Sequence, residues 1–316
     1  MPPAPIEGSR FLVTGGSGFV GSHVVDELVA GGASEVVVFD KIVRAENLEQ
    51  ARAAGSVRVL EGDVTDRGVL AEAAAGVDGV FHLAVLPIGP SEADPRLALD
   101  VNVVGTFNVI EAAQQAGAKK VVYSSASSVY GDTNETMDES HPLEARSMYG
   151  ASKIAGEYFL RAFHEIHGLD YVTLRYMNVY GPRQNGGLIV SVLRRIESGQ
   201  PPVIQGDGSA SFDFVHVADV ARLNVAAMAS DVSGEAFNVG SGGEASVREV
   251  VEQLIELTGA DLEPEYDLEA KVLMARRVGS NERAVKELGW QPALDLETGL
   301  TEVIAFERSK AGTARA

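Results

Sequence analysis

The sequence predicts an α/β protein with a doubly wound parallel sheet and a smaller C-terminal α/β lobe. Two observations support this fold class: apolar strand candidates alternate with helix candidates, and a glycine-rich turn joins the first strand to the first helix. Alternating strands and helices imply right-handed crossovers and therefore a parallel sheet. We place the first domain at residues 1–176 and the lobe at residues 177–316, and allow later segments to return to the first domain.

The expected strands are short apolar runs bounded by turn or helix signals. The first helix carries Val20, Val24 and Leu28 on one stripe and runs to about Ala30. Beyond residue 182 the pattern becomes less regular, as expected for a separate lobe. The expected strands are residues 10–14, 35–40, 57–61, 79–82, 120–123 and 171–175, and the expected longer helices are residues 96–116, 149–167, 217–229 and 246–258.

Composition excludes several classes of function. The 316 residues include no cysteine, which excludes disulfides, thiol nucleophiles and cysteine-ligated zinc and fits a cytoplasmic location. A net charge of −19 argues against general nucleic-acid binding, which needs a basic surface. We expect no signal peptide at the start of the chain and no membrane span, because no apolar run approaches roughly 18 residues.

The glycine-rich turn has the spacing Gly-x-x-Gly-x-x-Gly. Gly15 allows the tight turn, Gly18 lets a phosphate approach the backbone, and Gly21 lets the helix pack on the strand. The helix start at Phe19 and Val20 would meet a pyrophosphate. This pattern predicts a Rossmann-type dinucleotide site.

Two acidic positions bear on the adenosine end of such a cofactor. Asp40 ends the second strand, where a carboxylate accepts ribose hydroxyls and repels a 2′-phosphate, so NAD is favoured over NADP. Lys41 and Arg44 lie nearby and temper that preference. Asp63, followed by Val64, either holds the adenine amino group or caps a helix.

A tyrosine and a lysine four residues apart share one helix face. These are Tyr149 and Lys153. A lysine charge would lower the phenol pKa, so that the tyrosine could take a proton from a sugar hydroxyl while a nicotinamide takes the hydride. The alternative is two surface residues on an amphipathic helix.

Ten stretches of the chain together resemble the extended short-chain dehydrogenase/reductase family, and within it the nucleotide-sugar epimerases and dehydratases. The resemblance covers nearly the whole chain. It rests on TGGSGFVGSH (14–23), Asp40, GDVTD (62–66), FHLA (81–84), NVVGTFNVIEAA (102–113), YSSASSVYG (123–131), YGASK (149–153), LRYMNVYGPR (174–183), GDGSASFDFVHVADV (206–220) and FNVGSG (237–242).

The resemblance implies roles for individual residues. Tyr149 would exchange the proton at the sugar O4, and Lys153 would hold the nicotinamide ribose. Asn178 would bind a substrate phosphate or sugar oxygen. Arg183 is either a diphosphate ligand or a solvated loop arginine. The residues placed around NAD are Leu83, Ala84, Asn102, Ser124, Met177 and Val179.

Two positions depart from the family pattern. Ala126 occupies the place of a Ser or Thr that hydrogen-bonds O4, and a methyl group cannot relay a proton. Either Ser125, our first choice, or Ser127 supplies the hydroxyl, or Tyr149 works alone; these serines could also only cap turns.

The second departure is Phe212, which replaces the arginine that grips the diphosphate. A phenyl ring cannot make a charge-assisted bond to phosphate. Arg276 or Arg277 compensates, or Phe212 stacks on a base or sugar.

The reaction follows from the residues after Ala126. The family's 4,6-dehydratases carry Asp-Glu there and its decarboxylases usually carry Glu, whereas this chain has Ser127 and Ser128. What remains is NAD-dependent 4-epimerisation of a nucleotide sugar. A dehydratase, a decarboxylase and a non-catalytic NAD-binding protein stay as alternatives. We also expect a homodimer, formed by the apolar faces of helices 96–116 and 149–167.

Overall fold

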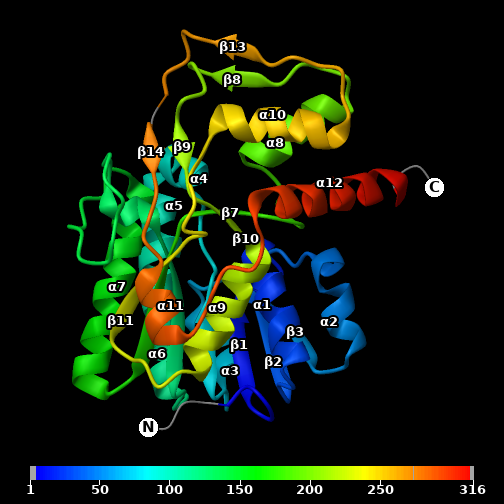
Figure 1. Ribbon diagram of the computed structural model, residues 1–316. Coiled ribbons are helices and arrows are strands. Elements are labelled where there is room, and N and C mark those ends of the chain that lie inside the picture. The colour runs from blue at the N-terminus through cyan, green and yellow to red at the C-terminus, as the bar shows by residue number, and fades with distance from the viewer. Residues whose placement is uncertain (1–4, 273, 314–316) are drawn as a thin grey trace.

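The computed structural model describes residues 5–272 and 274–313. The first four residues, where we expect no signal peptide to begin, lie outside the described residues. The centre of the structure is a seven-stranded parallel sheet in the order β11-β6-β5-β4-β1-β2-β3 (Figure 1). The doubly wound fold is therefore confirmed. The strands of this sheet are β1 (Arg10–Thr14), β2 (Glu35–Asp40), β3 (Val57–Glu61), β4 (Gly79–His82), β5 (Lys120–Ala126), β6 (Asp170–Tyr176) and β11 (Glu235–Val239).

The strands lie where the apolar runs predict them, because a parallel strand covered on both faces is apolar almost throughout. In β2 the four central residues are fully buried. The bounds of β1 to β4 agree with the sequence, whereas β5 and β6 extend beyond the expected runs. Sequence reasoning missed β11 as a strand. It pairs in parallel with β6 and forms one edge of the sheet.

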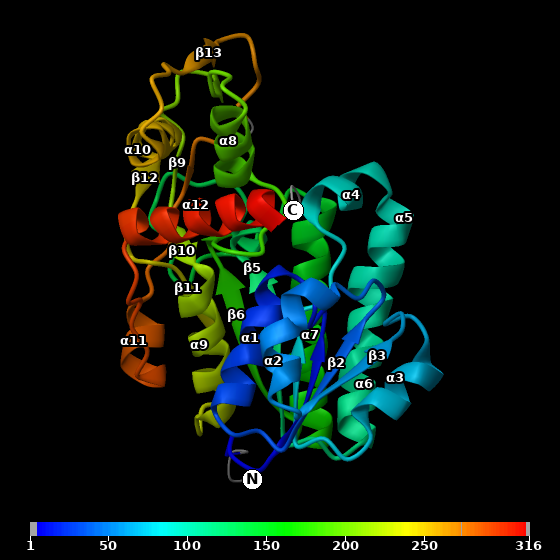
Figure 2. The same cartoon turned by 90° about the vertical axis from the view of Figure 1, so that its right-hand side faces the viewer.

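Helices cover both faces of the sheet, as Figures 1 and 2 show together. One apolar core lies under α1 and α9, and the other lies under α3, α6 and α7. The helices of this domain are α1 (Phe19–Ala30), α2 (Glu49–Ala53), α3 (Arg67–Ala74), α4 (Ile88–Ala93), α5 (Pro95–Ala98), α6 (Thr106–Gln115), α7 (Met148–His167), α9 (Val217–Ala229) and α11 (Glu282–Leu288), with short 3-10 turns η1 (Ala45–Leu48) and η3 (Ser127–Tyr130).

The expected single helix over residues 96–116 is wrong in detail. A π-helical segment, η2 (Leu99–Gly105), separates α5 from α6. Within it, the Asn102 side chain accepts a hydrogen bond from the Leu86 amide at 2.7 Å and donates to its carbonyl at 3.0 Å. The widened turn thus directs a buried amide at the loop after β4, and π-bulges are frequent at functional sites.

The C-terminal lobe lies above the carboxyl ends of the strands (Figures 1 and 2). It has its own apolar core, built from α8, α10 and α12. Both α9 and β11 return to the first domain, while the boundary at residue 176 stays a prediction. No helix in the described ranges is long and apolar enough to cross a membrane. The lobe and the strands leading to it comprise β7 (Asn178–Tyr180), α8 (Leu188–Glu197), β8 (Val203–Gln205), β9 (Ser211–Phe212), β10 (Phe214–His216), β12 (Ala245–Ser246), α10 (Val247–Thr258), β13 (Glu265–Asp267), β14 (Arg276–Arg277) and α12 (Leu296–Thr313).

Candidate active site

The glycine-rich turn between β1 and α1 has the geometry of a dinucleotide cradle. Gly15 has a φ of 67°, and a Cβ there would lie 2.7 Å from the Ala84 amide nitrogen. A Cβ on Gly21 would collide with the Gly15 carbonyl, so the helix can approach the turn only with glycine. The N-cap is Gly18, and neither a side-chain cap nor a first-turn acid competes for the free amides. These amides suit a pyrophosphate.

At the adenosine end, Asp40 is held in place by the turn itself. Its carboxylate accepts from the Ser17 amide at 3.1 Å and from the Ser17 hydroxyl at 2.8 Å. Lys41 forms an ion pair of 2.8 Å with Asp63. The cap alternative for Asp63 is wrong, because the N-cap of α3 is Asp66.

A cavity of about 830 Å³ lies where β5, α7, β7 and the lobe meet. Ser127, Ser128 and Tyr149 border it, as do Asn178 and Arg277. Phe19, Met177 and Val179, which we expect beside the cofactor, border it too. The cavity therefore joins the turn at α1 to the tyrosine on α7.

Lys153 lies between two tyrosine rings. Its ammonium donates to the Ser124 carbonyl at 2.6 Å and lies 5.6 Å from the ring centre of Tyr149 and 5.0 Å from that of Tyr123. Burial raises the pKa of Tyr149 to about 12. Burial also lowers the pKa of Lys153 to about 7. The lowered phenol pKa expected from the sequence is therefore wrong for this ligand-free chain, since burial penalises both charged forms.

The serines after Ser124 divide between two environments. Ser125 borders the cavity, but its hydroxyl donates to Glu157 at 2.6 Å, so our first choice for the relay does not present a free hydroxyl to a sugar. Ser128 is 7 % exposed, and its hydroxyl has no hydrogen-bond partner among the described residues. Ser127 is also buried beside the cavity. Ser125 lies within β5, whereas Ser127 and Ser128 lie in the turn η3 that follows the strand.

The arginines considered as diphosphate ligands lie in different surroundings. Arg183 pairs with Asp26 on α1 at 2.6 Å, so it is neither a cavity residue nor a solvated loop arginine. Arg276 pairs with Glu244 at 2.8 Å and does not border the cavity, which contradicts its assignment as a substrate ligand. Arg277, buried and adjacent in sequence, does border it.

Phe212 lies at the junction of this cavity with a second one of about 420 Å³ in the lobe. Its ring packs edge-on against Phe214, with 6.0 Å between ring centres. The arginine position of the family is thus occupied by an aromatic cluster. Arg277 is the guanidinium that this arrangement leaves beside the cavity.

The remaining expected cofactor residues surround the carboxyl ends of the strands. Leu83 and Val64 are buried in the apolar cores. Ala84 follows β4, and its amide donates a hydrogen bond to the Thr14 hydroxyl at 3.3 Å. His82 bonds two threonine hydroxyls, and burial lowers its pKa to about 3, which agrees with a structural rather than catalytic histidine.

The comparison with known proteins agrees with this geometry. The model of the NAD dependent epimerase/dehydratase family matches residues 11–240. The chain belongs to this family. Its members are nucleotide-sugar enzymes of the extended short-chain dehydrogenase/reductase type, and NAD is the cofactor.

Relatives within the epimerase/dehydratase family carry out different reactions. A UDP-glucose 4-epimerase of Mycolicibacterium smegmatis is 38% identical, with 95% of this chain and 99% of the relative covered. A dTDP-glucose 4,6-dehydratase of Actinoplanes sp. is 31% identical, with 95% and 98% covered. The UDP-N-acetylglucosamine 4-epimerase of Methanobrevibacter ruminantium, solved with UDP-N-acetylmuramic acid, is 31% identical with a TM-score of 0.91, covering 96% of this chain and 99% of that one. Family membership therefore leaves the reaction open.

Three residues of this epimerase/dehydratase site were not predicted from the sequence or were considered only in another role. Ser128 was weighed only as a missing carboxylate, and Arg277 only as an alternative to Arg276. Glu157, the partner of Ser125, was not considered. Its spacing of four residues after Lys153 was a visible signal, because residues i and i+4 of a helix are neighbours.

Proposed function

We propose that this enzyme is an NAD-dependent nucleotide-sugar 4-epimerase acting on a UDP-hexose or UDP-hexuronic acid through a transient 4-keto sugar. The observation that carries the proposal is the pair Ser127 and Ser128, which border the cavity beside Tyr149. The resemblance implies an Asp-Glu pair at these two positions for 4,6-dehydration and usually a Glu at the position of Ser128 for decarboxylation. Hydroxyls cannot replace these carboxyl groups as acid and base.

In this proposal Tyr149 exchanges the proton of the sugar O4. Lys153 places a positive charge beside the Tyr149 ring, which would stabilise the phenolate during proton transfer. A bound NAD would accept the hydride from C4 and return it. The glycine turn and Asp40 would hold it with the pyrophosphate at α1 and the ribose at β2.

Epimerisation also requires the 4-keto sugar to turn over while its diphosphate stays bound. Arg277 and Asn178 border the cavity and are the groups we assign to the diphosphate and to a phosphate or sugar oxygen. The cavity of about 830 Å³ that these groups border is where we place the sugar.

The chain contains no cysteine, which fits a reducing compartment, and we propose the cytoplasm as its location. The acidic balance of −19 gives no basic surface for nucleic acid. We therefore propose a nucleotide sugar as the partner, together with a second copy of the chain.

The deciding experiment incubates the purified protein and NAD with a panel of UDP-, GDP-, CDP- and dTDP-sugars and identifies the products. We expect interconversion of a pair of UDP-sugars that differ only at C4. A 4-keto-6-deoxy sugar as product would establish dehydration instead, and release of CO₂ from a uronic acid would establish decarboxylation. No turnover of any sugar by a protein that binds NAD would favour the non-catalytic alternative.

A further inference from the structure

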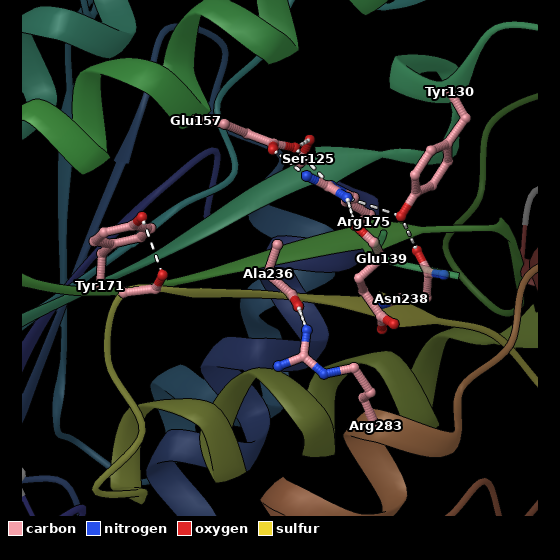
Figure 3. Close-up of polar contacts among 10 residues, drawn as sticks. Ser125, Tyr130, Glu139, Glu157, Tyr171, Arg175, Ala236, Asn238 and Arg283 are labelled. Carbon is pink, nitrogen blue, oxygen red and sulfur yellow. Dashed lines mark hydrogen bonds and ion pairs between the residues drawn. The ribbon is translucent and has the colours of Figure 1, made fainter. Parts of the chain in front are cut away.

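A buried carboxylate lies directly behind the catalytic pair. Glu157 is on α7, one helical turn after Lys153, and is 9 % exposed. It pairs with Arg175 of β6, whose Nε lies 3.1 Å from Oε1 and whose Nη2 lies 2.7 Å from Oε2 (Figure 3). Sequestering two charges costs desolvation energy, and a buried ion pair is often no more stable than an apolar replacement. Stability alone therefore does not account for this pair.

Two consecutive residues of β5 are tied to two residues of α7 one turn apart. The Ser124 carbonyl accepts from Lys153 at 2.6 Å, and the Ser125 hydroxyl donates to Glu157 at 2.6 Å. Together these bonds fix the register of the helix against the end of the strand. Because Tyr149 is on the same helix, the same two bonds fix its position relative to the serines that follow on η3.

The cluster also reaches the loop that borders the cavity. Arg175 donates through Nη1 to the Tyr130 hydroxyl at 2.9 Å, and Tyr130 donates to Asn238 at 2.7 Å (Figure 3). Tyr130 ends η3, the turn that begins with Ser127. The network thus links α7, β6, η3 and the edge strand β11, so that Glu157 is held by groups from several elements.

Few titratable groups face Lys153. They are Tyr149 and Glu157 on its own helix, Tyr123 on β5 and His82 on β4. Burial keeps His82 neutral near pH 7. Burial lowers the pKa of Lys153 to about 7, and Glu157 opposes that shift. Glu157 is the one carboxylate of the described chain with this effect on Lys153.

We propose that Glu157 is a positioning residue of this site: held by Ser125 and Arg175, it fixes α7 against β5 and so keeps Lys153 beside Tyr149. The inference rests on the proposed roles of Tyr149 and Lys153. It adds that the Ser125 hydroxyl serves the helix rather than the sugar, and that the charge on Lys153 depends on a carboxylate outside the cavity.

The test measures the pKa of Lys153 directly, by NMR titration of isotope-labelled lysine, with the signal assigned through Lys153→Met. Removing an opposite charge about one helical turn away should lower the pKa by about 1–3 units, so Glu157→Gln should leave Lys153 mostly neutral at pH 7. Ser125→Ala is the matched control, because it removes a hydrogen bond to Glu157 and leaves its charge. Its Lys153 pKa should stay close to that of the native protein.

An unchanged Lys153 pKa in folded Glu157→Gln would overturn the proposal, as would an equal fall in Ser125→Ala. If Glu157→Gln does not fold, the double variant Glu157→Gln/Arg175→Gln removes both charges and lets the two amides bond each other. Because a positive charge is lost together with the negative one, a smaller downward shift of the Lys153 pKa is expected there, and its absence would also overturn the proposal. The titration needs no substrate, so its result is independent of whether the protein is an epimerase.

Discussion

The ammonium of Lys41 lies 2.8 Å from the carboxylate of Asp63. The two residues come from the ends of neighbouring strands, since β2 and β3 are adjacent and parallel. The cation that would otherwise attract a 2′-phosphate is thereby paired with an anion. Asp40, on the same edge, is held in place by two bonds from Ser17.

The native protein should therefore bind NAD in preference to NADP. Asp40→Asn removes the repulsion of a 2′-phosphate and weakens the acceptor of the ribose hydroxyls, so NAD affinity should fall by about 10-fold or more, with a much smaller change for NADP. Isothermal titration with both cofactors measures this. Asp63→Asn, which releases Lys41, should chiefly improve NADP binding. Equal affinity of the native protein for both cofactors would contradict the assignment of Asp40.

Replacing Tyr149 by Phe should abolish turnover while NAD stays bound. The phenol oxygen is the group assigned to the O4 proton, and loss of a positioned acid or base costs about 10²–10⁴ in rate. The ring packs beside Lys153 in either case, so the fold should persist. Rates on the sugar identified by the panel, with NAD binding followed by fluorescence, give both readouts. Activity near the native level would remove Tyr149 from the mechanism.

The hydroxyl that assists Tyr149 should come from Ser127 or Ser128. Loss of the responsible hydroxyl should slow turnover by about 10²-fold, as expected for a group that helps transfer a proton. Ser125→Ala is the comparison, since the Ser125 hydroxyl is bonded to Glu157. A large loss confined to Ser125→Ala would reverse this assignment. Small effects in all three single variants and in the Ser127/Ser128 double variant would mean that Tyr149 acts alone.

Arg277 should hold the diphosphate in place of the arginine that Phe212 replaces. A charge-assisted hydrogen bond contributes about 1.5–3 kcal/mol, so Arg277→Gln should weaken UDP binding by about 10- to 100-fold and leave NAD binding unchanged. Arg276→Gln is the matched control, because Arg276 pairs with Glu244 away from the cavity. Titration with UDP separates the two variants. Equal losses in both would show that the effect is not specific to the cavity.

The protein should be a homodimer through the faces of η2, α6 and α7. Leu99, Val104 and Phe107 are more than a third exposed there, and Tyr158 on α7 is 58% exposed. Tyr158→Glu should give a monomer by light scattering at micromolar concentration, since a charge on each copy would have to be buried. Leu268→Glu, on a more exposed apolar residue of the lobe, should leave the mass unchanged. A native monomer would end this prediction.

Many of the strand bounds in the first domain could be predicted from the sequence, because they depend on local patterns of apolar residues. The apolar runs of β1, β2 and β4 give their own bounds, since a strand buried on both faces is apolar almost throughout. The π-helical segment η2 could not be predicted in this way. Gly105, at its end, lies against Val64, where any Cβ would be too close, and that contact joins segments about 40 residues apart.

The sequence by itself determined the family, the cofactor turn and the positions of Tyr149 and Lys153, because each depends on spacing within one turn or helix. Tertiary structure alone decided which of these polar side chains are bonded to a glutamate. Ser125 and Ser128 differ little in sequence context, and so do Arg276 and Arg277. Ser125 and Arg276 bond Glu157 and Glu244, whereas the Ser128 hydroxyl has no partner among the described residues and Arg277 borders the cavity and donates to the Gly131 carbonyl at 3.2 Å. Their partners, Glu157 and Glu244, are 32 residues away in both cases, at Ser125–Glu157 and Arg276–Glu244. Competition among such distant partners is settled only when the chain folds, because the energy of a buried hydrogen bond or ion pair depends on what packs around it.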